Sequence, residues 1–206
     1  MPTAAPVSPA ALPADSASTS ASDHADKRRI FPGWRWALLV LAIPIVGLIG
    51  WAIGGHVDGV GPALLGGVIT GAGLGAAQWF AARGGFGDWR AWVGVSAVAY
   101  GLGLAAGAAL VDYGTELGSL AAMGAITGIV LGAGQGAVLS LSGRQRLAVA
   151  WGVGMPVMLA IGWSVTTLGG IDVDEQFTIF GAFGAIVFTL LSGLLFARFH
   201  TPETRK

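Results

Sequence analysis

The chain contains no cysteine and few charged residues, and each scarcity excludes a class of protein. Without cysteine there are no disulfide bonds, thiolate metal sites or cysteine nucleophiles. Charged residues make up 11% of the 206 residues, less than half of the roughly 25% that is typical of a soluble domain. Basic and acidic residues balance at 11 each. No basic stretch is interleaved with aromatics, which argues against a nucleic-acid partner.

Apolar residues dominate the composition instead, at 54% with a mean hydropathy of +0.72. This composition predicts an all-α membrane protein with six transmembrane helices, because six apolar segments each have about 20 residues or more, enough to cross roughly 30 Å of hydrocarbon. No segment alternates polar and apolar residues, as the strands of a membrane barrel do. The predicted helices cover about residues 36–55, 60–82, 91–111, 117–142, 147–170 and 177–198.

The two ends of the chain differ from these segments. Residues 1–29 are rich in Ala, Ser and Pro and hold almost nothing large and apolar. Such a segment cannot offset the entropy of ordering itself, so we predict a disordered cytoplasmic tail. Residues 201–206 form a second cytoplasmic tail, which leaves residues 30–200 as the transmembrane domain.

Every lysine and arginine falls on one side of the predicted membrane, before the first segment, around the second and fourth turns, or after the sixth segment. The other turns carry no basic residue and hold Asp58, then Asp112 and Glu116, then Asp172, Asp174 and Glu175. Because basic flanks stay in the cytoplasm, we expect a multi-pass protein of the inner (cytoplasmic) cell membrane with both termini cytoplasmic. Six tryptophans fall near the same predicted interface, where an amphipathic ring is stable: Trp34, Trp36, Trp79, Trp89, Trp92 and Trp151.

An internal repeat organises the apolar segments. A shift of 57 residues places residues 67–78 on residues 124–135, and eight of these twelve positions are identical. A duplicated unit explains this match better than composition does. A degenerate third copy has Ser192 at the position of Gln78 and Gln135. We therefore predict three helical hairpins, and because each hairpin crosses the membrane twice, they are parallel repeats about an axis normal to the membrane.

The repeated unit resembles a set of bacterial polytopic membrane proteins built from hairpins of the form Gly-x3-Gly-x2-Gln-Trp, followed by an arginine and a tryptophan-bearing helix. The resemblance covers most of residues 60–200, and its second copy departs from the pattern, because Gly136 follows Gln135. The set carries no assigned activity, so the resemblance implies a fold and no function. The residues that carry it are Gly71, Gly75, Gln78, Trp79, Arg83 and Trp92.

Two rows of glycine at four-residue spacing follow the repeated helices. At about 40° of drift per step, each row forms one groove along its helix. Such a groove lets another helix approach closely, and close packing is a main source of helix association in lipid. We predict helix-packing faces; the alternative is a pore lined by bare backbone. The rows are Gly67, Gly71 and Gly75, and Gly124, Gly128, Gly132 and Gly136.

Gln78 and Gln135 share the faces of these glycine rows. An amide inside the membrane requires hydrogen-bond partners, and the candidates are Thr70, Thr127, Ser192 and the opposite glutamine. The pair either fixes the packing register through an interhelical hydrogen bond or belongs to a polar ring that contacts a substrate. We favour the first interpretation.

No Asp, Glu, Lys, Arg or His lies in the interior of any of the six apolar segments, which argues against ion-coupled transport. His56 and His200 lie on opposite sides of the membrane, so we expect no metal site and no cofactor. The hydroxyls of Ser96, Tyr100, Ser164, Thr166 and Thr167 have no base within reach in their own helices, and such hydroxyls usually bond to helix carbonyls. We therefore expect no catalytic residues and no enzyme activity.

Two functions remain open. The first is a compact helical bundle with a structural or partner-binding role, surrounded by the lipid bilayer and associating with a second copy or another membrane protein. The second is an uncoupled facilitator for a small neutral solute or lipid, with a path between the three hairpins.

Overall fold

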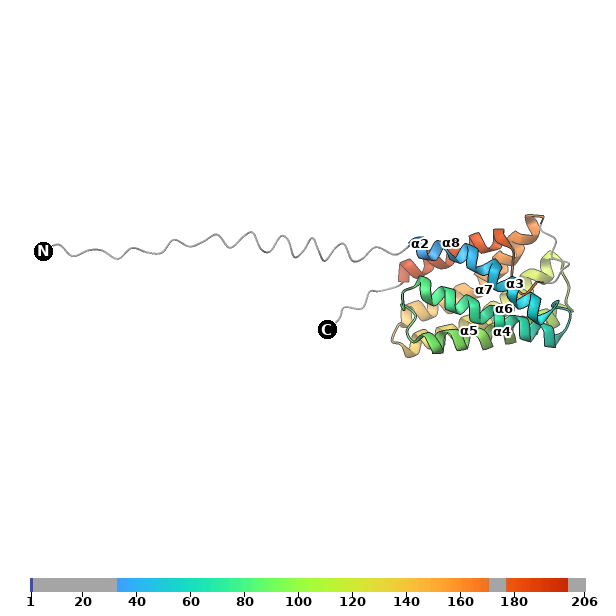
Figure 1. Cartoon of the computed structure of the whole chain (residues 1–206), viewed down its shortest axis with the longest axis horizontal. Coiled ribbons are helices and arrows are strands. Elements are labelled where there is room, and N and C mark those ends of the chain that lie inside the picture. The colour runs from blue at the N-terminus through green and yellow to red at the C-terminus, as the bar shows by residue number, and fades with distance from the viewer. Residues whose placement is uncertain (2–32, 171–176, 200–206) are drawn as a thin grey trace. The chain divides into compact units, whose positions relative to one another are not determined.

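The computed structural model describes Met1, residues 33–170 and residues 177–199. Across these residues it contains helices and no strands, which confirms the all-α prediction. The predicted tails, apart from Met1, and the acidic turn at residues 172–175 lie outside the described residues. The helices are α2 (Gly33–Ala37), α3 (Leu39–Gly54), α4 (Val60–Ala81), α5 (Trp89–Leu110), α6 (Leu117–Leu141), α7 (Gln145–Leu168) and α8 (Ala182–Phe199) (Figure 1).

Six helical segments are long and apolar enough to cross a membrane, in agreement with the sequence. The first span, Gly33–Gly54, combines α2 and α3. The other five spans are α4 to α8, with 18 to 25 residues each. The structure is therefore that of a multi-pass membrane protein.

Two helices, α5 and α7, begin before their predicted starts, and of these only α5 has a side-chain cap. α5 begins at Trp89 and not at residue 91, because the Asp88 side chain accepts a hydrogen bond of 2.9 Å from the backbone N–H of Ala91. α7 begins at Gln145, two residues before the predicted start. A charge ends an apolar run without ending the helix, so hydropathy alone places both starts too late.

The predicted start of the last helix, residue 177, is wrong, because α8 begins at Ala182. Thr178, Ile179 and Phe180 are buried although they are not helical. In a helix, the carbonyl of Thr178 would accept a bond from residue 182. Here it accepts a hydrogen bond of 2.9 Å from the hydroxyl of Tyr100 in α5, so a tertiary contact replaces the first helical turn.

The spans form a closed cycle of contacts. Each helix from α3 to α7 packs against the next one in the chain, and α8 also packs against α3. Short connections explain the neighbour contacts, because they make consecutive helices adjacent. The contact between α8 and α3 joins the first span to the last.

The predicted glycine row of α4 faces α5. A Cβ atom placed on Gly67 would lie 2.8 Å from the Cα of Gly101, and one on Gly75 would lie 2.7 Å from the Cβ of Ser96. Gly71 faces the backbone of Ser96 even more closely. None of these positions has room for a larger residue.

The predicted glycine row of α6 faces α7 in the same manner. A Cβ atom on Gly124 would lie 2.8 Å from the carbonyl oxygen of Leu159, and one on Gly128 would lie 2.6 Å from that of Met155. Gly132 would meet the carbonyl oxygen of Gly152 at 2.8 Å, and Gly136 that of Ala148 at 3.3 Å. The backbones of α6 and α7 therefore touch along much of their length.

The bundle has two chemically different ends. Aromatic contacts bring together the start of the first span, the α4–α5 loop, the starts of α5 and α7 and the end of α8. This end, called the basic end below, carries Asp88 and the described arginines Arg35, Arg83, Arg90, Arg144, Arg146 and Arg198. The opposite, acidic end carries Asp58, Asp112 and Glu116.

Replacing Gly128 by Ala tests the close packing of α6 on α7. The new methyl would clash with the backbone of Met155 and Pro156, so we expect a loss of about 1–3 kcal/mol in the free energy of unfolding. Gly94→Ala in α5 is the matched control, because a Cβ atom there meets no atom within 4 Å. Denaturant unfolding in detergent measures both, and equal losses would contradict the packing role of Gly128.

Candidate functional site

The side chain of Gln135 is the centre of a buried polar network. Its amide nitrogen donates to Oε1 of Gln78 at 3.0 Å and to Oγ of Ser96 at 2.8 Å. Its oxygen Oε1 accepts a hydrogen bond of 2.7 Å from the indole nitrogen of Trp151. Gln78, Ser96, Gln135 and Trp151 are fully buried. This Gln135 network therefore links one residue from each of α4, α5, α6 and α7.

The glycine rows give the network its room. Gly75 lies one helical turn before Gln78, and a Cβ atom placed on Gly75 would lie 2.7 Å from Oγ of Ser96. Ser96 also donates to the backbone carbonyl of Trp92 at 2.7 Å, which holds its oxygen toward Gln135. A larger residue at position 75 would displace the hydroxyl that Gln135 uses.

Two buried donors next to the network have no partner. They are Nε2 of Gln78 and Nε1 of Trp92. Exchanging the amide oxygen and nitrogen of Gln78 would not remove the unpaired donor, because the NH₂ group of Gln78 would then face the NH₂ group of Gln135. A buried donor without a partner costs about 1–3 kcal/mol, so these two groups can receive a hydrogen-bond acceptor from elsewhere.

Five rings, called the aromatic cluster below, fill the bundle at the basic end. Phe86 stacks on Trp92 with centroids 4.0 Å apart, and Trp36 stacks on Phe196 at 5.0 Å. Phe86 also contacts Trp151 and Phe196, each at 5.0 Å. All five rings are buried. Residues from both ends of the described chain thus meet around Phe86.

The α4–α5 loop inserts Phe86 through two glycines. Gly84 and Gly87 have φ angles of +77° and +90°, which side-chain-bearing residues rarely adopt. The indole of Trp79 donates to the carbonyl of Gly87 at 2.9 Å and fastens the loop to α4. These glycine conformations and the Trp79 bond flank Phe86, whose ring is fully buried.

Trp36 closes the cycle of helices with a hydrogen bond. Its indole nitrogen donates to Oγ of Ser192 in α8 at 3.2 Å. Trp151 makes the corresponding bond to Gln135, which precedes Ser192 by 57 positions. The same type of indole bond therefore joins the first span to α8 and α7 to α6.

A second polar group lies around Thr178, the residue that precedes α8. Its hydroxyl donates to the carbonyl of Gly47 in α3 at 3.0 Å and accepts from that of Thr70 in α4 at 2.8 Å. With the bond from Tyr100, Thr178 joins α3, α4 and α5 to the segment before α8. An apolar cavity of about 200 Å³ lies beside this segment, and neither Gln78 nor Gln135 lines it.

The predicted polar residues separate into different sites. Gln78 and Gln135 come together, whereas Thr70 bonds Thr178, Thr127 donates to the carbonyl of Met123 at 2.8 Å, and Ser192 accepts from Trp36. The hydroxyls of Ser96, Ser164, Thr166 and Thr167 donate to the carbonyl four residues earlier, as expected. Tyr100 instead bonds across the bundle.

Burial divides the tryptophans that the sequence places near one interface. Trp36, Trp92 and Trp151 are buried in the aromatic cluster, whereas Trp34 and Trp89 are exposed. The sequence places all of them at the same depth, and only the packing separates lipid-facing rings from inward-facing ones. Sequence reasoning also missed Phe86 and Thr178, because both lie outside the helices.

The chemistry of the Gln135 network is neutral. Its groups are amides, one hydroxyl and one indole, which donate and accept hydrogen bonds but carry no charge at neutral pH. Among the described residues, no group of three or more His, Asp or Glu residues could hold a metal ion. The chain matches no protein-family model, no curated protein and no solved structure.

A double-mutant cycle on Gln78→Met and Gln135→Met tests the amide pair. We expect a coupling energy of about 0.6 kcal/mol, and up to about 1.7 kcal/mol, as for other interhelical bonds in membranes. The cycle is measured by denaturant unfolding in detergent. Gln78→Met with Gln145→Met is the control, because Gln145 is exposed and bonds elsewhere. Equal coupling in both cycles would exclude a specific bond between Gln78 and Gln135.

Replacing Phe86 by Ala tests the aromatic cluster. The change removes a fully buried ring with four aromatic neighbours, so we expect a loss of about 3–5 kcal/mol in the free energy of unfolding. Phe183→Ala removes a ring of the same size that is 51% exposed. A loss for Phe86→Ala no larger than that of the control would show that the cluster does not hold the helices together.

Proposed function

We propose that this chain is a multi-pass protein of the inner cell membrane that acts as a compact bundle with a structural or partner-binding role. Both termini are cytoplasmic in this proposal. The six spans are three parallel-repeat hairpins, α2–α4, α5–α6 and α7–α8. We propose no enzyme activity, because the Gln135 network lacks a general base, a charged nucleophile and a metal ligand set.

The charges of the two ends support the orientation. The described arginines all lie at the basic end, while Asp58, Asp112 and Glu116 lie at the other. The positive-inside rule assigns the basic end to the cytoplasm. The start of α2 and the end of α8 belong to that end.

Equivalent contacts support the repeats. Gly67, Gly71 and Gly75 of α4 face α5, and the glycines 57 positions later in α6 face α7. The indole bonds of Trp151 and Trp36 reach residues that are also 57 positions apart. Such correspondence is typical of a duplicated hairpin.

The observation that carries the proposal is how the interior polar and aromatic groups are used. Gln135 bonds to three other helices, and the aromatic cluster packs five rings together at the basic end. The hydrogen bonds and ring contacts of these groups join the helices to one another. A bundle filled in this way offers its outer surface to partners.

One observation favours the alternative, an uncoupled facilitator for a small neutral solute or lipid. Nε2 of Gln78 and Nε1 of Trp92 are buried donors without partners. A solute with a carbonyl or hydroxyl oxygen would supply an acceptor for such a donor if the aromatic cluster opened. The two functions therefore differ in whether water reaches Gln78.

Single cysteines separate the two functions, because the chain has no native cysteine. In intact cells we expect Gln78→Cys and Gln135→Cys to stay unlabelled by a membrane-impermeant thiol reagent, since both sites are fully buried. Asp112→Cys at the acidic end should react from outside. Arg90→Cys at the basic end should react only after the cells are opened.

Labelling of both glutamine positions would support the facilitator and overturn the closed bundle. Labelling of Arg90→Cys from outside would overturn the orientation. Denaturation is the control for the unlabelled variants: once the protein is unfolded, every introduced cysteine must react with the reagent.

A further inference from the structure

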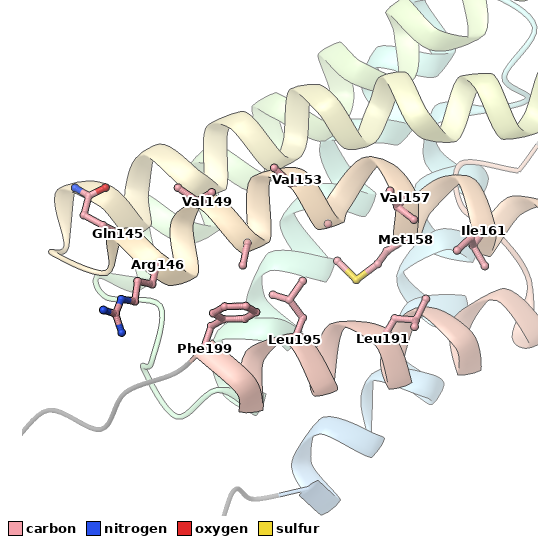
Figure 2. A pocket seen from close by; sticks show the side chains of 12 residues that line it. Gln145, Arg146, Val149, Val153, Val157, Met158, Ile161, Leu191, Leu195 and Phe199 are labelled. Carbon is pink, nitrogen blue, oxygen red and sulfur yellow. The ribbon is translucent and has the colours of Figure 1, made fainter.

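An apolar groove of about 890 Å³ lies between α7 and α8. Its α7 wall is Val149, Val153, Val157 and Ile161, and its α8 wall is Leu191, Leu195 and Phe199. Figure 2 shows the α8 side chains pointing toward α7, with Met158 pointing back from α7. The volume is within the range of about 300–1,000 Å³ that ligand sites occupy.

The groove has a polar group at one end only. Gln145 and Arg146 line it at the basic end, and Figure 2 shows both beyond the last valine. Arg146 is exposed, and its guanidinium has no hydrogen bond or ion pair with any described residue. Arg198, next to Phe199 in the last turn of α8, adds a second exposed positive charge at this end.

The length of the groove matches one leaflet. Arg146 and Ile161 are 161 − 146 = 15 positions apart on α7, which corresponds to about 22 Å along the helix. Half of a bilayer, with its headgroup region included, is about 20–22 Å thick. The groove therefore reaches from the headgroup level through the full depth of one leaflet.

The walls suit a lipid chain better than another helix. Tight helix pairs in membranes need exposed small residues, whereas Val149, Val153 and Val157 are 56–69% exposed here. The glycine of this surface, Gly154, is already covered, because a Cβ atom on it would lie 2.6 Å from Cδ1 of Leu195. A flexible acyl chain fits between branched side chains without close backbone contact.

We propose that the α7–α8 groove is a binding site for an anionic phospholipid, with an acyl chain along the groove and the phosphate at Arg146. Basic pockets between membrane helices recognise such headgroups by charge. The proposal rests on the proposed function for the membrane orientation, which makes the lipid one of the inner leaflet. It also gives the outer surface of the bundle a specific partner.

The test is native mass spectrometry of the full chain in detergent with added phosphatidylglycerol or phosphatidylcholine. We expect phosphatidylglycerol to bind about five-fold more tightly, the factor that one arginine near an anionic headgroup contributes. Arg146→Gln should remove this preference. Arg90→Gln, an exposed arginine of the basic end that does not line the groove, should keep it.

A second pair of variants tests the chain site. Val153→Trp fills the groove and should weaken binding of both lipids, whereas Val98→Trp changes a similarly exposed valine of α5 outside the groove and should not. An unchanged preference in Arg146→Gln would overturn the proposal. So would a dimer that Val153→Trp abolishes and lipid does not affect, because a second copy would then occupy the groove.

The failure of this inference is distinguishable from that of the proposed function. Thiol labelling at Gln78→Cys reports on the interior of the bundle and does not involve the groove. If the cysteines at positions 78 and 135 are labelled and the protein still prefers phosphatidylglycerol, only the proposed function is overturned. If the cysteines at positions 78 and 135 stay unlabelled and the protein shows no preference for phosphatidylglycerol, only the lipid-site proposal is overturned.

Discussion

The distance at which helix backbones approach one another determines this structure. Lipid tails are as apolar as the helices, so burial of apolar surface gives the helices little reason to associate. Association depends on contact, and contact depends on positions such as Gly71 and Gly128, where a Cβ atom has no room. The polar bonds depend on the same closeness, because the Gln135 amide reaches Ser96 only beside Gly75. Close packing is thus the condition for the hydrogen bonds, and the hydrogen bonds in turn define the register in which the helices pack.

Much of this architecture could be predicted from hydropathy and repetition. The six spans follow from apolar length, and the pairing of Gln78 with Gln135 was one of the alternatives that helical periodicity allowed. The aromatic cluster could not be found in this way, because burial of Trp92 and exposure of Trp89 depend on rotation about a helix axis. The burial of Thr178 and Phe86 could not be predicted for a related reason. Both residues lie in non-helical segments, where the hydrophobic residues follow no regular spacing.

The polar groups inside the bundle are neutral, and this affects how the protein tolerates its surroundings. A charged network in hydrocarbon would respond to pH and membrane potential. Amide, hydroxyl and indole groups respond to neither, so the Gln135 network holds four helices in the same way under different conditions. The charged residues of the described chain lie at the two ends, where they set the position of the bundle relative to the headgroups without altering its interior.

The bond from Trp36 to Ser192 has a consequence for biogenesis, because its two residues are 156 positions apart. A nascent chain exposes the inward face of its first span until α8 leaves the ribosome. Until then Trp36 lies in the translocon or the lipid without Ser192, its hydrogen-bond acceptor, and the aromatic cluster still lacks Phe196. Completion of the core therefore requires α8, and a product truncated before α8 carries an open seam that quality-control proteases of the membrane can recognise.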